Sequence, residues 1–282
     1  MIKKIYMPIR VILLSFFLCA SACANGRVET VQFQSKLVNA TLPYNVILPT
    51  DYNTSRTTRY PVLYLLHGLT GHYSDWVSRT NLADYAARYR MIVVTPEGND
   101  SWYVDQYESY ILQELIPDVQ KRYRTIEARY ARSIAGLSMG GYGAIKFGLK
   151  SPAMFVFAGS MSGAFSAPRL SEQEFAAARW GDSVKLFGPA GSETRLANDL
   201  FSIIEKLTPA RVSSLPYFYF DCGTADSPLI FPSNRDLAAL MFEKKIAHEF
   251  RQLPGDHSWE YWDRQVQEVL KISASKMRTS RA

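Results

Sequence analysis

The stretch Gly136-Leu137-Ser138-Met139-Gly140-Gly141 decides the fold, because it places a G-x-S-x-G pattern between an apolar run and a helix candidate. The apolar run covers residues 130–135, and the small-residue-rich segment 142–149 has the composition of a helix. A serine on a sharp turn between a strand and a helix forms a nucleophile elbow. Its flanking residues must be small, because strand and helix approach each other closely there. The motif therefore predicts a nucleophilic Ser138, if its partners follow in order.

Strands and helices alternate along the rest of the chain, which indicates an α/β fold with a mainly parallel, doubly wound sheet. Segments 28–37 and 40–48 alternate polar and apolar residues around Asn39, so an antiparallel hairpin is expected at the sheet edge. Segment 162–215 is too long for a simple crossover and is expected to place helices over the site. Buried strands are expected over 61–66, 91–95, 131–135, 155–160, 217–221 and 248–253, and helices over 81–89, 106–123, 232–245 and 258–271.

The first 24 residues are typical of a secretory signal peptide. A basic start is followed by an apolar stretch, 11–20, and then by small residues that suit cleavage. The apolar stretch is too short to span a bilayer comfortably. We therefore expect an exported protein, periplasmic or secreted, in which residues 25–282 form one domain without a linker.

Cys23 offers a second interpretation of this leader. Residues 20–23, Ala-Ser-Ala-Cys, loosely resemble a bacterial lipoprotein box, whose cysteine is lipidated, although Leu is usual where Ala20 stands. On that interpretation the protein would be a lipid-anchored lipoprotein. Membrane contact is expected in that case alone.

Charge and cysteine content exclude further classes of protein. The formal net charge of +6 falls to +3 when the leader removes three basic residues and no acid. This excess is too mild to indicate a nucleic-acid partner. Of the three cysteines, Cys222 alone lies well inside the mature chain, so no intrachain disulfide framework is expected. Its place in the apolar run 217–223 favours a buried packing role over a nucleophilic one.

An acid and a histidine follow Ser138 in the order Ser, Asp, His that suits this type of site. Asp226 comes directly after the predicted strand 217–221, at the sheet edge where ligands bind. Asp221 is the alternative acid, but its place within the strand favours a structural role. His257 is the one histidine after Ser138 that is expected in a loop.

These three side chains supply what nucleophilic attack by a serine requires. A serine hydroxyl is a poor nucleophile at neutral pH unless a base accepts its proton. Neutral His257 would accept that proton and return it to the leaving group. Asp226 would fix the tautomer of His257 and stabilise the imidazolium.

Backbone donors for an oxyanion are expected from two places in the chain. His67-Gly68-Leu69-Thr70-Gly71 follows the first buried strand, where such folds provide one donor. We assign the donors to the N–H groups of Leu69 and Met139. The residues expected to line a substrate pocket, with ordinary loop packing as the alternative, are His67, Trp102, Tyr103 and Trp259.

The chain resembles the esterase D family of serine esterases within the α/β-hydrolase fold. The likeness rests on segments 65–71, 96–103, 136–144, 222–226 and 254–259, which span nearly all of the mature chain in order. It implies a carboxylesterase acting on short or small acyl groups, with Ser138, Asp226 and His257 as the triad and no cofactor or metal. Family members share this machinery and differ in the covering segments, so the motifs are less specific for substrate.

Three functions remain open from the sequence. The leading one is an exported esterase that forms an acyl-Ser138 intermediate and hydrolyses it with water. The second is an acyltransferase of the mycolyltransferase type, in which a sugar or lipid hydroxyl replaces water. The third, a binding protein on an inactive scaffold, is disfavoured because no triad or oxyanion residue is missing. The export signal argues against the cytosolic S-formylglutathione hydrolases of the same family.

Overall fold

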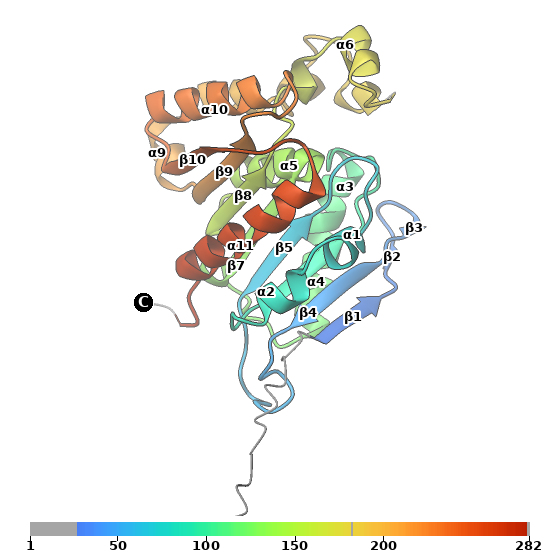
Figure 1. The fold of residues 1–282 in the computed structure, drawn as a ribbon, viewed down its shortest axis with the longest axis vertical. Coiled ribbons are helices and arrows are strands. Elements are labelled where there is room, and N and C mark those ends of the chain that lie inside the picture. Colours follow the sequence, from blue (N-terminus) through green and yellow to red (C-terminus); the bar gives the residue numbers. More distant parts are fainter. Residues whose placement is uncertain (1–26, 182, 281–282) are drawn as a thin grey trace, which may run out of the picture.

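A computed structural model describes residues 27–181 and 183–280 and arranges them around one large sheet (Figure 1). The predicted leader, Cys23 included, lies outside the described residues. Strand β4 runs antiparallel to both neighbours, and the remaining pairs are parallel. In spatial order the strands are β1 (Arg27–Val31), β4 (Tyr44–Leu48), β6 (Ile92–Pro96), β5 (Val62–Leu66), β7 (Arg132–Leu137), β8 (Phe157–Met161), β9 (Tyr217–Gly223) and β10 (His248–Leu253).

Helices cover both faces of the sheet, as the alternation of strands and helices predicts. Side chains alternate along a strand, so Leu63 and Leu65 of β5 pack with α1, α2 and α11, while Tyr64 and Leu66 pack with α4, α5 and α10. The helices are α1 (Asp75–Ser78), α2 (Leu82–Ala86), α3 (Gln106–Ser109), α4 (Ile116–Arg122), α5 (Ser138–Lys150), α6 (Glu172–Ala177), α7 (Glu193–Leu196), α8 (Leu200–Glu205), α9 (Pro209–Ser213), α10 (Phe231–Glu243) and α11 (Trp259–Lys276).

Two elements differ from the sequence-based expectation. The N-terminal hairpin is interrupted: β1 pairs with β4 in the large sheet, while β2 (Gln34–Ser35) and β3 (Ala40–Thr41) form a separate two-stranded sheet. The helix expected over 106–123 is not uniform, because the π-helical segment Tyr110–Leu115 separates α3 from α4. Both departures involve Glu114 of that segment, whose carboxylate accepts bonds from the turn between β2 and β3.

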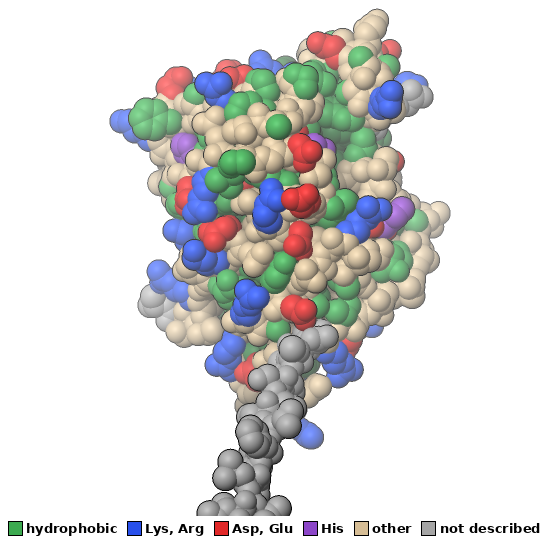
Figure 2. All heavy atoms as spheres, viewed as in Figure 1, with side chains coloured by type: hydrophobic (Ala, Val, Ile, Leu, Met, Phe, Trp, Pro, Cys, Tyr) green, Lys and Arg blue, Asp and Glu red, His purple; other side chains and the backbone are tan. Residues whose placement is uncertain are grey.

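The covering segment (162–215, of which 182 is outside the described residues) contributes α6 to α9, as expected for an insertion longer than a crossover. Figure 1 shows α6 at the upper end of the molecule, beyond the edge of the sheet. Among the residues that the structure describes, no helix has the length and hydrophobicity that a transmembrane segment needs. Basic and acidic side chains are interspersed on the face seen in Figure 2.

Candidate active site

Ser138 stands at the turn between β7 and α5. Its backbone has a φ of +52°, in the left-handed region that non-glycine residues rarely adopt. A Cβ on Gly136 would lie 2.5 Å from the carbonyl of Gly140, and one on Gly140 would lie 2.5 Å from the carbonyl oxygen of His67. These contacts explain why the elbow requires glycine. The backbones of β7, α5 and the loop after β5 lie so close together that no Cβ atom fits between them.

The structure brings Ser138, His257 and Asp226 into one hydrogen-bonded row. His257 Nε2 lies 3.0 Å from Ser138 Oγ, and His257 Nδ1 lies 3.0 Å from Asp226 Oδ1. The carboxylate is an acceptor, so Nδ1 carries the hydrogen and Nε2 is left to accept the serine proton. Asp226 follows β9 and His257 follows β10, so all three side chains sit at the carboxyl edge of the sheet.

The surroundings of Asp226 favour the ionised form of its carboxyl group. Burial acts to raise the pKa of the Asp226 carboxyl, but the hydrogen bond and charge of His257 outweigh burial and hold that pKa below its usual value. The N–H of Ser227 also donates to Asp226 Oδ1, at 2.6 Å. The thiol of Cys222 lies 3.7 Å from Asp226 Oδ2. Cys222 is buried, as expected, and burial raises the pKa of its thiol, which keeps it protonated and a donor.

Asp221, the alternative acid, makes different contacts. It is fully buried in β9 and accepts hydrogen bonds from the hydroxyls of Tyr219 and Tyr261, at 2.8 and 2.7 Å. Burial raises the pKa of Asp221 to about 7, even though both tyrosine bonds lower it. Asp221 therefore belongs to a buried tyrosine pair, and the carboxylate that touches His257 is that of Asp226.

A buried polar scaffold holds the loop after β5 in place. His67 Nδ1–H donates to the carbonyl of Gly68 at 2.8 Å, and the N–H of Gly71 donates to the same oxygen at 3.1 Å. The Gly68–Leu69 peptide is planar, so fixing its carbonyl also fixes the direction of the N–H of Leu69. The N–H of Met139 lies in the first turn of α5, where N–H groups have no acceptor within the helix.

Glu97 supports this scaffold; it lies in segment 96–103, but the sequence assigned it no role. Its carboxylate lies 3.2 Å from His67 Nε2. The N–H of Gly98 is shared between that nitrogen, at 2.9 Å, and the carboxylate, at 3.1 Å, and the carboxylate also accepts the N–H of Asn99. Burial would raise the pKa of Glu97, but its interactions with His67 bring that pKa down to about 2. The carboxylate of Asp100 fixes the next part of the loop by accepting the N–H of Thr70 at 2.6 Å.

A cleft of about 520 Å³ opens beside Ser138 and His257. Two of the expected pocket positions behave differently in it: Trp259 lines the cleft, whereas His67 is fully buried behind the loop. The other residues that line the cleft are Gly68, Leu69, Thr70, Gly71, Asp75, Arg79, Leu137, Arg179, Trp180, Ser258 and Trp262.

Trp102 and Tyr103 do not line this cleft, which corrects the expectation from the sequence. Trp102 is 1% exposed, and Tyr103 is fully buried with its hydroxyl bonded to the carbonyl of His67. Both have a φ of +52°. The indole of Trp102 points into an aromatic cluster with ring centroids 5.4 to 5.9 Å away, formed by Tyr142, Phe175, Trp180 and Phe187. Trp102 therefore supports the covering segment, and Tyr103 supports the loop after β5, rather than a substrate.

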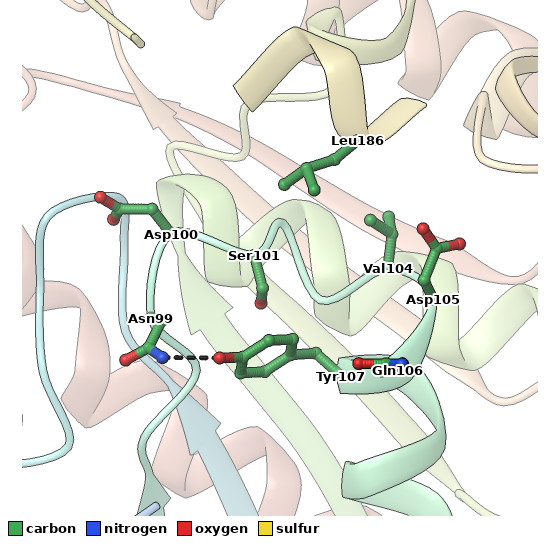
Figure 3. A pocket seen from close by; sticks show the side chains of 8 residues that line it. All are labelled: Asn99, Asp100, Ser101, Val104, Asp105, Gln106, Tyr107 and Leu186. Carbon is green, nitrogen blue, oxygen red and sulfur yellow. Dashed lines mark hydrogen bonds between the residues drawn. The ribbon is translucent and has the colours of Figure 1, made fainter. Parts of the chain in front are cut away.

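A second cavity, of about 450 Å³, is lined mainly by the loop that follows β6 (Figure 3). It is lined by Asn99, whose amide donates to the hydroxyl of Tyr107, and by Leu186 of the covering segment. Asp100 of this cavity accepts the N–H of Thr70, which lines the cleft at Ser138. Within the described part of the chain, no three His, Cys, Asp or Glu side chains are arranged to hold a metal ion.

Several cleft residues carried no clear signal in the sequence. Trp262 stands three residues after Trp259, so the helical period alone would have placed both on one face of α11. Its ring contacts His257 edge-on, with centroids 4.9 Å apart. Arg79 and Arg179 come from a short helix end and from the covering segment, which sequence patterns do not place in space.

The sheet, the serine at the strand–helix turn, and the histidine and acid on later loops together define an α/β-hydrolase. The chain belongs to the family described as "Putative esterase", whose model matches residues 35–271. It is therefore an esterase, and the expected resemblance is confirmed.

Characterised relatives agree with this family. An acetyl esterase of Caldicellulosiruptor saccharolyticus is 27% identical over 255 residues, which cover 85% of this chain and 95% of the relative. The structure of the serine hydrolase FphF of Staphylococcus aureus matches with a TM-score of 0.79 at 26% identity, covering 89% of this chain and 99% of that one. A ferulic acid esterase matches with a TM-score of 0.77 at 27% identity, covering 90% and 99%.

Proposed function

We propose that this chain is an exported serine carboxylesterase that hydrolyses short-chain, acetyl or small aryl esters through an acyl-Ser138 intermediate. The observation that carries the proposal is the row of hydrogen bonds from Ser138 Oγ through His257 to Asp226. Support for the substrate class comes from relatives that are named acetyl esterase and ferulic acid esterase. The leader pattern of residues 1–24 supports export.

In the first half of the reaction, Ser138 Oγ attacks the ester carbonyl while His257 Nε2 takes its proton. The charge that develops on the carbonyl oxygen is stabilised by the N–H groups of Leu69 and Met139. Asp226 stabilises the imidazolium of His257. The carbon–oxygen bond to the alcohol then breaks, and His257 returns the proton to the leaving alcohol oxygen.

In the second half, a water molecule replaces the alcohol. His257 takes a proton from the water as its oxygen attacks the acyl carbon of acyl-Ser138. The bond to Ser138 Oγ breaks, the carboxylic acid leaves, and the proton returns from His257 to Ser138. A sugar or lipid hydroxyl in place of water would give an acyltransferase with the same residues. Product analysis with and without added alcohols separates these two outcomes.

The test compares the purified mature chain with its Ser138→Ala variant on p-nitrophenyl acetate, butyrate and octanoate and on methyl ferulate. Removal of a serine nucleophile lowers kcat by about 10⁵-fold or more in comparable triads. Ser133→Ala is the matched control, because Ser133 is a buried serine of β7, the strand that ends just before Ser138, and does not line the cleft. Equal rates for Ser138→Ala and the parent would exclude the proposed nucleophile.

A further inference from the structure

Two arginines stand in the wall of the cleft that contains Ser138. Arg79 directly follows α1, and Arg179 belongs to the turn after α6 in the covering segment. Asp75 is the one acidic side chain among the described residues that line this cleft. The cleft beside the nucleophile therefore carries an excess of positive charge, and arginine keeps its charge at every pH of interest.

Neither guanidinium is fully neutralised by its neighbours. Arg79 Nε lies 3.6 Å from Asp75 Oδ1, with 56% of the arginine side chain exposed. The other oxygen of Asp75 already accepts the N–H of His72 at 3.1 Å. Arg179 is exposed, and its guanidinium makes no hydrogen bond or ion pair with any other described residue. Such a guanidinium in a cleft wall has its donors available to an anion.

The backbone at Arg179 is held in place although the side chain is exposed. Its φ of +59° lies in the left-handed region, which costs energy for a side chain of this kind. The next residue, Trp180, packs against Trp102 and Phe175 with ring centroids 5.4 Å away in both contacts. The aromatic cluster thus holds the turn in a conformation that Arg179 alone would not favour.

Tryptophans supply the rest of the wall. Trp180, Trp259 and Trp262 line the same cleft, and the guanidinium of Arg79 lies 5.6 Å from the ring centre of Trp259. Indole rings suit the apolar body of a ligand, and guanidinium groups suit a planar or tetrahedral anion at its end. The tryptophans and arginines together suit an ester that has both an apolar part and an anionic group, rather than an uncharged ester.

We infer that the cleft is a binding site for esters that carry an anionic group, a carboxylate or a phosphate, held by Arg179 and Arg79. The inference rests on the proposed esterase function and adds the charge of its substrate. The ester carbonyl would lie at Ser138 and the apolar part against the tryptophans. The anion would reach the two arginines from either the acyl or the alcohol side.

The first arm of the test uses p-nitrophenyl pentanoate and the mono-p-nitrophenyl ester of glutaric acid. They have the same number of acyl carbons and differ in a terminal methyl against a carboxylate. We expect kcat/KM to be about fivefold or more higher for the charged ester, because an exposed charge pair is modest in strength. The preference should shrink at high salt, where exposed charges are screened.

The second arm identifies the kind and side of the anion. It compares phenyl acetate with 4-acetoxybenzoate and 4-acetoxyphenyl phosphate, which place a carboxylate or a phosphate on the alcohol side. Preference for the glutarate ester alone would assign the anion to the acyl side. Preference for one acetoxy compound would assign it to the alcohol side and name the carboxylate or the phosphate.

Variants then connect the preference with the two arginines. Arg179→Gln should lower the ratio of charged to neutral kcat/KM several-fold, Arg179→Lys should restore part of it, and the Arg79→Gln/Arg179→Gln double variant should abolish it. Arg90→Gln is the control, because Arg90 pairs with Asp51 and does not line the cleft. Using the ratio cancels any general loss of activity in a variant.

The outcomes separate this inference from the proposed function. If the parent hydrolyses neutral esters without preferring any charged one, or if the ratio is unchanged in the double variant, the anion site is excluded while the esterase function stands. If the parent hydrolyses neither the neutral nor the charged esters, the proposed function itself fails.

Discussion

Asp221 and Asp226 stand five residues apart on and after the same strand, yet their surroundings give them opposite properties. Asp226 faces His257 and the N–H of Ser227, which favour its ionised form. Asp221 faces two tyrosine hydroxyls in a fully buried site, where burial favours its protonated form. The same side chain thus serves as the partner of His257 in one place and as an acceptor for two tyrosine hydroxyls in the other, where burial opposes its ionisation.

This difference predicts which aspartate is needed for activity. Asp226→Asn should lower kcat by roughly 10⁴-fold, because an amide would favour the wrong tautomer of His257. Asp221→Asn should retain most of the parent's kcat, since an amide can still bond with both tyrosine hydroxyls. Steady-state hydrolysis of p-nitrophenyl acetate measures both. Loss of activity in Asp221→Asn with retention in Asp226→Asn would move the acid to Asp221.

The two aspartates also predict opposite effects of pH on stability. The pKa of Asp221 is about 7 in the fold and near 3.8 when unfolded, so its stabilising protonated form is fully present below about pH 4 and is lost as pH rises towards 7. Asp221→Asn should therefore raise the melting temperature relative to the parent at pH 8 and have less effect at pH 4.

Asp226→Asn is the matched control for this pH dependence. The pKa of Asp226 is lowered in the fold, so its ionised form contributes stability above the unfolded pKa, and this contribution is lost at low pH. The variant should be less stable than the parent at pH 8. Thermal melts of both variants between pH 4 and pH 8 measure the difference, and parallel curves for the two would contradict the assigned environments.

The loop between β5 and α1 depends on contacts from the loop that follows β6. Glu97 lies beside His67 and accepts the backbone N–H groups of Tyr73, Gly98 and Asn99, and His67 in turn fixes the carbonyl of Gly68. Because the N–H of Leu69 belongs to the same peptide unit, its direction is set from outside its own loop. A substitution of Glu97 should thus change the direction of the Leu69 N–H, which is proposed to stabilise the oxyanion, and leave the position of Ser138 unchanged.

Glu97→Gln should lower kcat by about tenfold with little change in KM, because a misplaced oxyanion donor weakens transition-state binding rather than ground-state binding. Glu114→Gln is the matched control. Glu114 also accepts two backbone N–H groups, but it holds the turn between β2 and β3, so its loss should lower the melting temperature and leave kcat intact. An unchanged kcat in Glu97→Gln would exclude the positioning role.

The strands were more predictable from the sequence than the irregular elements. Strands β5, β6 and β7 are buried on both faces. The sequences of β5 and β6 are therefore almost wholly apolar, and in β7 the apolar residues follow Arg132 and Ser133. The break in the hairpin and the π-helical segment at Tyr110–Leu115 left no comparable pattern. They depend on the contact of Glu114 with the turn 36–37, which joins residues nearly 80 positions apart and cannot be read from a local period.

At the level of the whole chain, the covering segment is attached through an aromatic cluster centred on Trp102. Four rings surround this indole: Tyr142 of α5, and Phe175, Trp180 and Phe187 of the covering segment. The carbonyl of Tyr103, next in sequence, accepts a bond from the buried ammonium of Lys146 at 2.7 Å. The segment is thus fastened to the body of the domain at this strained turn, and also at Asn198, whose carbonyl accepts the hydroxyl of Tyr142 at 2.7 Å.

Trp102→Ala should therefore loosen the covering segment more than the sheet. Removal of a buried tryptophan costs about 3–5 kcal/mol of folding free energy. Under native conditions, trypsin should cut the variant faster after Arg179 and Lys185, as mass spectrometry of the fragments would show. Phe242→Ala is the control, because Phe242 is 79% exposed and holds nothing in place. Cleavage at the parent's rate at both sites would contradict this attachment.

Site residues at strand ends were predicted from the sequence, whereas site residues that long-range packing brings to the cleft were not. Ser138, Asp226 and His257 each follow a strand end, so their order and spacing along the chain are enough to indicate a common location. Trp102 and Tyr103 also follow a strand, but their rings turn inward because φ is positive at both positions. Arg179 reaches the cleft by way of a segment whose path is determined by tertiary contacts alone.

The attachment at Trp102 makes this esterase a natural starting point for directed evolution. Ser138, Asp226 and His257 follow strand ends, while Arg179 and Trp180 belong to a segment that packs against the domain through aromatic rings. Libraries that randomise residues 171–190 but keep Phe175 and Phe187 would vary which esters the cleft accepts. They would leave the hydrogen bonds between Ser138, His257 and Asp226 unchanged. The proposed catalytic residues and the segment that is proposed to select the ester can then be optimised separately.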